Sequence, residues 1–184
     1  MAEPRRQLLM DDRTVQRSIA RMARELIEWT GGTDGVVLIG IQRRGVQLAE
    51  LMADEIERAE SARPAVGSLD ITLYRDDLMA IGPRPVVGET RLPSGGIDER
   101  IVVIVDDVSF TGRTARAAMD ELADFGRPAR IILCVLIDRG HRELPVQPDI
   151  VGRVVQTART QRVDVLVPGV DGRLAVELAD ARSE

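Results

Sequence analysis

Two adjacent carboxylates, Asp106 and Asp107, close the apolar run at residues 101–105, and the hydroxyl-rich turn Thr-Gly-Arg-Thr follows at residues 111–114. A glycine turn that opens a helix presents unpaired backbone N–H groups to a phosphate, although threonine and glycine are also ordinary helix caps. A phosphate site beside two acids calls for a ligand that also carries hydroxyl groups. A ribose 5-phosphate fits, because the acids accept hydrogen bonds from the 2′ and 3′ hydroxyls and favour positive charge at the anomeric carbon.

Three more polar segments follow predicted strands, namely QRRG at 42–45, YRDDL at 74–78 and DRGHREL at 138–144. In open parallel sheets, ligands bind outside the carboxyl ends of the strands, so these turns are further candidates for the site. Arginine suits phosphoryl oxygens because its planar fork donates two hydrogen bonds at once. The alternatives are a solvated helix start for Arg43 and Arg44, and a surface ion pair for Arg75.

Helix and strand patterns alternate along the chain and predict the elements that position these turns. Apolar positions at helical spacing predict a helix from Asp12 to Trp29, stopped by two glycines, with Trp29 as a packing residue. Two further helices are predicted, one through Leu48 and Ile56 and one whose Phe125 faces inward before a stop near Gly126. Strands are predicted at 35–41, 68–74, 101–105, 131–137, 163–167 and 173–177. We therefore expect an α/β fold with a doubly wound, mostly parallel sheet flanked by helices, in a single domain over residues 1–184.

The amino-acid composition argues against several kinds of catalytic and metal site. All 25 basic residues are arginine, which excludes lysine general bases, Schiff bases and the lysine of the Walker phosphate loop. One histidine and one cysteine make a zinc site or a Ser-His-Asp triad improbable and exclude an intramolecular disulfide. No apolar run is long enough to cross a membrane and no secretory signal is present, so we expect a cytoplasmic protein. The net charge of −5 argues against indiscriminate nucleic-acid binding.

The motifs taken together resemble a known family. GIQRRG, DITLYRDDL, IVVIVDDVSFTGRTARAAMDEL, GRP and LIDRGHRELP occur in this order over nearly the whole chain. They resemble the PyrR family, the pyrimidine operon attenuation proteins that are also uracil phosphoribosyltransferases. The resemblance implies the type I phosphoribosyltransferase fold with a small hood region and a mobile loop. It also implies conversion of uracil and 5-phosphoribosyl 1-diphosphate (PRPP) to UMP and diphosphate, with Mg²⁺ carried on PRPP.

The resemblance also assigns roles to residues. Asp106 and Asp107 would hold the ribose hydroxyls, and Arg75 would help to close the mobile loop over diphosphate. Diphosphate would be bound by Gln42, Arg43, Arg44 and Gly45, and the 5-phosphate by the segment Val108, Ser109, Phe110, Thr111, Gly112, Arg113 and Thr114. No residue is identified as a protein ligand of a metal or as a general base. Ser109-Phe110 and residues 152–160 depart from the family pattern, so base contacts near Arg153 are not carried over.

A basic stripe on the first helix points to a second ligand. At about 100° per residue, Arg13, Arg17, Arg21 and Arg24 fall within an arc of about 80° opposite the apolar face. The alternative is a merely solvated face that Glu28 partly neutralises. The resemblance implies nucleotide-dependent binding of pyrimidine leader mRNA, strengthened by UMP or UTP, and a homodimer or higher assembly. The RNA-binding residues it implies are Arg17, Arg21, Arg24, Arg139, His141 and Arg142, although Ala20, Arg24 and Gln147 depart from the family pattern.

Other functions remain open from the sequence. The chain is alternatively an RNA-binding regulator whose PRPP site only senses nucleotides, or a plain salvage phosphoribosyltransferase. A purine-specific phosphoribosyltransferase is a closer alternative. A receiver-like signalling domain also places paired acids at a strand end, but such domains use a lysine at the phosphoacceptor site, and this sequence contains none.

Overall fold

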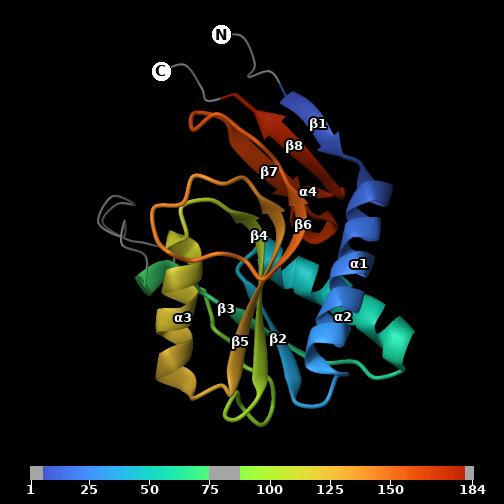
Figure 1. Ribbon diagram of the computed structural model, residues 1–184, viewed down its shortest axis with the longest axis vertical. Helices are drawn as coiled ribbons and strands as arrows, with labels where there is room; N and C mark the ends of the chain where they lie inside the picture. The colour runs from blue at the N-terminus through green and yellow to red at the C-terminus, as the bar shows by residue number, and fades with distance from the viewer. Residues whose placement is uncertain (1–5, 75–87, 181–184) are drawn as a thin grey trace.

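The computed structural model describes residues 6–74 and 88–180, which form two sheets (Figure 1). The larger sheet has five strands in which every neighbouring pair is parallel. Their order is β3 (Ala65–Leu69), β2 (Val36–Ile41), β4 (Ile101–Ser109), β5 (Arg130–Asp138) and β6 (Ile150–Val154). This arrangement confirms the predicted α/β fold with a mostly parallel sheet.

Helices cover both faces of this sheet, which explains the uninterrupted apolar runs in its central strands. The helices α1 (Asp12–Thr30) and α2 (Arg44–Glu60) cover one face, and α3 (Arg113–Phe125) covers the other (Figure 1). Every residue of β2 is buried. In β4, Val103 and Val105 join the core beneath α1 and α2, whereas Val102 and Ile104 join the core beneath α3.

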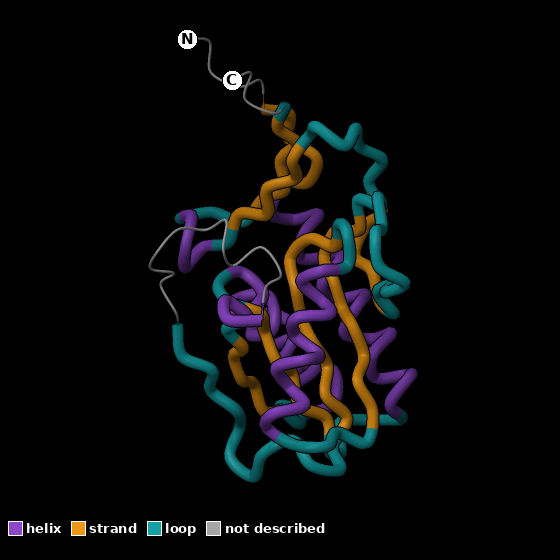
Figure 2. The backbone as a smooth tube through the Cα atoms, turned by 90° about the vertical axis from the view of Figure 1, so that its left-hand side faces the viewer, coloured by secondary structure: helices purple, strands orange, loops and turns teal. Residues whose placement is uncertain are grey.

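The smaller sheet is the hood. It is antiparallel, and its strands run in the order β1 (Arg6–Met10), β8 (Ala175–Ala179) and β7 (Arg162–Leu166). A single helical turn, α4 (Pro168–Asp171), joins β7 to β8. Figure 2 shows the hood standing above one end of the parallel sheet. The predicted strands at 163–167 and 173–177 are therefore β7 and β8, displaced by one or two residues.

The first helix follows its predicted pattern closely. Asp11 caps its start by accepting a hydrogen bond from the backbone N–H of Thr14 at 2.9 Å, and Gly31 ends it in the left-handed conformation. Trp29, predicted to be a packing residue, is instead 43% exposed, with the Arg130 guanidinium 5.6 Å from its ring centroid. Trp29 is the last residue but one of α1, so its side chain lies at the exposed end of the helix.

Three predicted details are wrong. Residues 68–74 do not form one strand, because the Asp70 carboxylate accepts a hydrogen bond from the backbone N–H of Thr72 and turns the chain into a 3-10 helix, η1 (Ile71–Tyr74). The strand that begins at Ile101 continues to Ser109 and includes both acids. Phe125 is 46% exposed rather than inward-facing, since α3 ends there.

The predicted mobile loop and Arg75 lie outside the described residues. Among residues 6–74 and 88–180, no helix is long and apolar enough to cross a membrane.

Candidate active site

The strand order changes direction between β2 and β4, and the two most polar turns lie at this point. From β2 the chain moves outward to β3, whereas from β4 it moves the other way through β5 to β6. Gly40 of β2 pairs with Val105 of β4, so the segments that follow these residues leave the sheet side by side. Ligands of open α/β sheets bind at such a switch point, and the two turns there are 42–45 and 106–114.

The turn at 42–45 is packed tightly against the sheet. The Gln42 backbone N–H donates to the carbonyl of Leu69 at 2.9 Å, and its side-chain amide donates to the carbonyl of Glu89 at 2.8 Å. The Gln42–Arg43 peptide bond is cis. Gly45 lies so close to β4 that a Cβ there would stand 2.4 Å from the carbonyl oxygen of Val105. The sheet therefore fixes where the first turn of α2 begins.

The acid pair lies at the end of β4, and its two carboxyl groups are close enough to interact with each other. Asp106 is 8% exposed and lines the cavity beside the start of α3, and Asp107 interacts electrostatically with Arg44. Burial raises the pKa of Asp106 well above its usual value, and the neighbouring Asp107 charge raises it further. Burial also raises the pKa of Asp107. Two buried carboxyl groups with few cationic partners favour a ligand that brings hydroxyl groups or positive charge.

The turn at 109–114 forms an open cradle at the start of α3. Gly112 has φ +93°, a left-handed conformation that favours glycine, and it precedes the first helical residue, Arg113. The N-cap residue Gly112 has no side chain to cap the helix, and the Arg113 N–H makes only a long hydrogen bond of 3.4 Å to Thr111 Oγ1, so the first backbone N–H groups of α3 can meet an anion. The Arg113 side chain donates to the Glu143 carboxylate at 3.1 Å.

A cavity of about 370 Å³ joins the cradle to Asp106. The whole turn from Val108 to Thr114 lines it, together with Asp106, Ala115, Leu133 and Val135. This volume is typical of a site for a small ligand. The structure therefore brings together Asp106 and all seven residues predicted to hold the 5-phosphate, whereas Asp107 and the turn at 42–45 are not among the residues that line this cavity.

The segment DRGHREL supports this cavity. Arg139 is 7% exposed, and its guanidinium lies 4.1 Å from the centroid of the Phe110 ring and donates to the carbonyl of Ala158 at 3.0 Å. The His141 ring meets the same phenyl ring edge-on, and its Nε2 lies 2.8 Å from the carbonyl of Thr157. Phe110 is thus held between a cation and an imidazole.

Arg142 connects the cradle at 109–114 to β5. Its guanidinium donates to the carbonyls of Phe110 at 2.6 Å and Val146 at 3.0 Å, and it forms an ion pair with Asp138 at 2.7 Å. Its side chain is 12% exposed. Sequence reasoning assigned this arginine to RNA and missed its contact with the cradle, because nothing local marks a bond to a carbonyl 32 residues away.

The predicted basic stripe of α1 is on the surface. Arg13, Arg17, Arg21 and Arg24 are all exposed. Arg21 is partly engaged, since it donates to the carbonyls of Val151 and Gly152 in β6 and pairs with Glu25 at 3.1 Å. These four side chains are therefore more accessible to an outside ligand than Arg139 or Arg142.

Comparison with known proteins identifies the family. Residues 9–165 match the phosphoribosyl transferase domain. The chain is 54% identical to the bifunctional protein PyrR of Chloroflexus aurantiacus over 91% of both chains, and 52% identical to that of Thermus thermophilus over 92% of this chain and 93% of the relative. The chain belongs to the PyrR family. The predictions of family and of a bifunctional phosphoribosyltransferase are thereby confirmed.

Solved structures agree on the fold of this PyrR family member. A hypoxanthine phosphoribosyltransferase from Staphylococcus aureus superposes with a TM-score of 0.70 at 14% identity, covering 96% of this chain and 93% of its own. That from Trypanosoma cruzi gives a TM-score of 0.69 at 16% identity, covering 96% and 97%. These likenesses confirm the type I phosphoribosyltransferase fold. The oligomeric state, the single-domain organisation and the roles of individual residues stay predictions.

Proposed function

We propose that this protein transfers the 5-phosphoribosyl group of PRPP to uracil, giving UMP and diphosphate. The observation that carries the proposal is the position of the buried Asp106 carboxyl group and the start of α3 around one cavity, with Asp107 directly beside Asp106. The cradle at 109–114 would hold the 5-phosphate through backbone N–H groups. Asp106 and Asp107 would hold the ribose hydroxyls, and the turn at 42–45 would hold diphosphate.

In the transfer, the bond between the ribose anomeric carbon and the diphosphate oxygen breaks, and its electron pair leaves with diphosphate. A new bond forms between that carbon and uracil N1, whose proton is released. The carboxyl pair would stabilise the positive charge that develops at the anomeric carbon. The fixed cradle and turn would position the two ends of PRPP for this step.

Phosphoribosyltransferases generally use PRPP with Mg²⁺, and the donor set here fits a metal that arrives on the substrate. Within residues 6–74 and 88–180, no group of three or more acidic, histidine or cysteine side chains could hold a metal ion. Mg²⁺ prefers phosphate oxygens and water with one or two carboxylates. Asp106 and Asp107 are carboxylates of this kind, and the bound ion would neutralise diphosphate as it leaves.

The test of this function is UMP formation from uracil and PRPP, with and without Mg²⁺. Hypoxanthine offered side by side distinguishes a purine-specific enzyme from a uracil enzyme. We expect turnover of uracil that depends on Mg²⁺. If the protein binds PRPP without any turnover, it is not a transferase, and the alternative of an RNA-binding regulator that only senses nucleotides is supported.

We further propose that the protein regulates pyrimidine genes by binding their leader mRNA, as the bifunctional name of its relatives suggests. The exposed arginines of α1 support this proposal, because guanidinium groups on one helix face attract RNA phosphates. Arg139 and Arg142 would act indirectly, by shaping the cavity whose occupancy by UMP or UTP strengthens RNA binding.

Filter binding of leader and scrambled RNAs, each with and without UMP, tests the RNA proposal. Arg17→Glu is a sharper probe than Arg21→Glu, since Arg21 also joins α1 to β6. We expect Arg17→Glu to weaken leader binding at least tenfold while transferase activity is unchanged. If both RNAs bind equally at physiological salt and UMP has no effect, the RNA proposal is refuted and the protein is a plain salvage enzyme.

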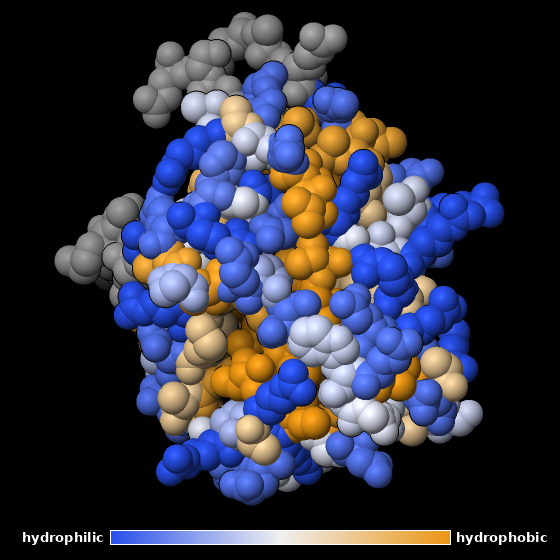
Figure 3. All heavy atoms as spheres, in the orientation of Figure 1, coloured by the Kyte–Doolittle hydropathy of each residue, from blue (hydrophilic) through white to orange (hydrophobic). Residues whose placement is uncertain are grey.

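We also propose a homodimer or a higher assembly. Figure 3 shows a band of hydrophobic side chains down the middle of one face, and Val154 at the end of the edge strand β6 is 69% exposed. Exposed apolar bands of this kind mark association surfaces. Sedimentation should therefore show a species larger than the 20.2 kDa chain at micromolar concentration.

A further inference from the structure

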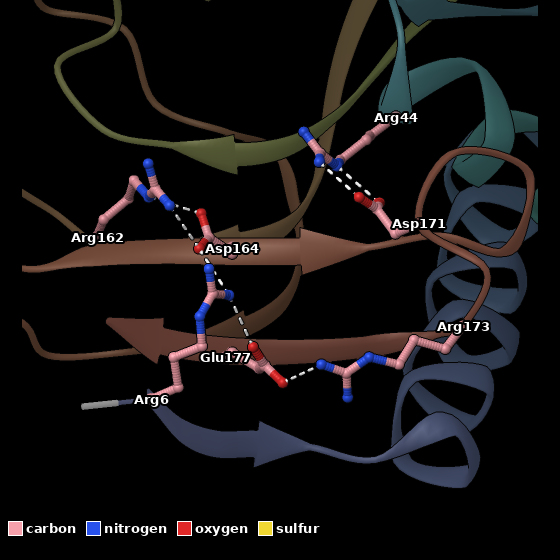
Figure 4. Close-up of polar contacts among 7 residues, drawn as sticks. All are labelled: Arg6, Arg44, Arg162, Asp164, Asp171, Arg173 and Glu177. Atoms are coloured by element: carbon pink, nitrogen blue, oxygen red, sulfur yellow. Dashed lines mark hydrogen bonds and ion pairs between the residues drawn. The ribbon is translucent and has the colours of Figure 1, made fainter. Parts of the chain in front are cut away.

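One ion pair joins the hood to the diphosphate turn. Arg44, the first residue of α2, donates from Nε to Oδ2 of Asp171 at 3.0 Å and from Nη2 to Oδ1 at 2.9 Å (Figure 4). Asp171 is the last residue of α4, and its Oδ2 also accepts the backbone N–H of Val167 at 3.0 Å. The carboxylate is 17% exposed and is therefore fixed by its own turn before it holds the arginine.

This pairing leaves one edge of the guanidinium available. A guanidinium has five N–H donors, and Asp171 takes one from Nε and one from Nη2. Within residues 6–74 and 88–180, the three other N–H groups of Arg44 meet no hydrogen-bond acceptor. Figure 4 shows the third nitrogen pointing away from Asp171. The free edge has the geometry that binds two oxygens of one phosphoryl group.

The hood also touches α2 directly at this place. A Cβ on Gly169 of α4 would lie 2.5 Å from Oε1 of Gln47, one turn after Arg44. The other ion pairs drawn in Figure 4 stay within the hood, such as Arg6 with Glu177 at 3.0 Å and Arg162 with Asp164 at 2.7 Å. Of the pairs drawn, the one between Arg44 and Asp171 alone connects the hood to the diphosphate turn.

We propose that Asp171 is a positioning residue that holds Arg44 in the orientation in which its free edge meets the diphosphate of PRPP. The inference rests on the proposed function, which assigns Arg44 to diphosphate. Without Asp171, a long side chain that is 39% exposed would sample many rotamers, and binding would have to order it. The hood thus contributes to diphosphate affinity without touching diphosphate.

The experiment compares two matched variants of the full chain. Asp171→Asn keeps the size of the side chain and the acceptor for Val167, but its amide group opposes a guanidinium donor. Asp164→Asn makes the same change on a hood carboxylate that pairs with Arg6 and Arg162 and that interacts with Arg44 electrostatically but without a hydrogen bond, so it controls for the lost charge. Calorimetric titration with inorganic diphosphate and Mg²⁺ is measured for both, with steady-state KM and kcat for PRPP and uracil.

We expect Asp171→Asn to weaken diphosphate binding at least fivefold and to raise KM for PRPP similarly, with kcat and the uracil KM within twofold of wild type. Asp164→Asn should leave diphosphate affinity unchanged. In an Arg44→Gln background, Asp171→Asn should cause no additional loss, because the arginine through which it acts is gone.

Wild-type diphosphate affinity in Asp171→Asn would overturn the inference, as would equal losses in both variants, since these would reflect hood stability alone. The titration does not depend on the nucleobase. Diphosphate binding that is sensitive to Asp171→Asn in a protein that does not turn over uracil would therefore uphold the inference and refute the proposed function. A wild-type chain that binds no diphosphate would refute the inference itself.

Discussion

The contact of Gly45 with β4 allows the effect of a single methyl group to be worked out. A Cβ at this position would lie 2.4 Å from the carbonyl oxygen of Val105, whereas ordinary contact begins at about 3.4 Å. β4 is the central strand of the parallel sheet and cannot yield. In Gly45→Ala, the start of α2 must therefore move outward by about 1 Å, and Arg44 and the turn before it move as well.

A displacement of about 1 Å at a positioning group costs on the order of 100-fold in rate, equivalent to about 2.7 kcal/mol. Overpacking of this kind also lowers the free energy of unfolding by about 1–3 kcal/mol. We therefore expect kcat/KM for PRPP to fall about 100-fold in Gly45→Ala, and diphosphate to bind more weakly, while the protein remains folded at 25 °C. Steady-state kinetics and urea unfolding measure the two effects.

Gly31→Ala is the matched control. Gly31 also has limited tolerance for a side chain, since its φ is +68°, but no atom lies within 4 Å of a Cβ placed there. It should cost about 1 kcal/mol of stability and leave kcat/KM unchanged. If Gly45→Ala retains kcat/KM within threefold of wild type, the argument that the sheet sets the position of the diphosphate turn is refuted.

Three further substitutions probe the cavity. Asp107→Asn should keep the fold but lower kcat/KM tenfold or more, about 1.4 kcal/mol, because it removes charge near the developing cation; wild-type kinetics would contradict this. Asp106→Asn should raise the free energy of unfolding at pH 8 by about 1–2 kcal/mol. The pKa of Asp106 is raised in the folded state, so this carboxyl group contributes stability below the usual aspartate pKa, and that contribution is lost as the pH rises through the folded-state pKa. The advantage of the variant should therefore vanish on acidification. Urea titrations from pH 8 to 4 measure this change. Phe110→Leu should raise KM for PRPP several-fold, since Arg139 and His141 lose the ring between them; an unchanged KM in steady-state assays would show that the ring only fills space.

Local patterns predicted the elements that pack against the parallel sheet. The helix over residues 12–29 and the strands at 35–41 and 131–137 each carry a complete apolar face or run, and each matches the structure within one residue. The strand predicted at 68–74 failed because the turn made by Asp70 interrupts a segment whose residue types favour strands. Short edge strands such as β1 and β6 have too few residues to show a period.

The turn at 109–114 was predictable because it consists of consecutive residues between a strand and a helix, so all of the information is local. The opposite holds for Asp171, which lies 127 residues from its partner Arg44. Its own surroundings, a proline and two glycines around a short turn, indicate only a loop. Arg139 and Arg142 were recognised as important, but their burial depends on where Phe110 comes to lie.

The hood has a consequence for the order of folding. β1 pairs with β8 across a long stretch of chain, with Arg6 of one bonded to Glu177 of the other at a separation of 171 residues. Closing so long a loop is unfavourable until the segments between are already compact. We therefore expect β1 to join β8 only after the parallel sheet has formed, and we expect the ion pair between Arg44 and Asp171, 127 residues apart, to form late as well. During folding, the turn at 109–114 can thus be complete before Asp171 holds Arg44 in the turn at 42–45.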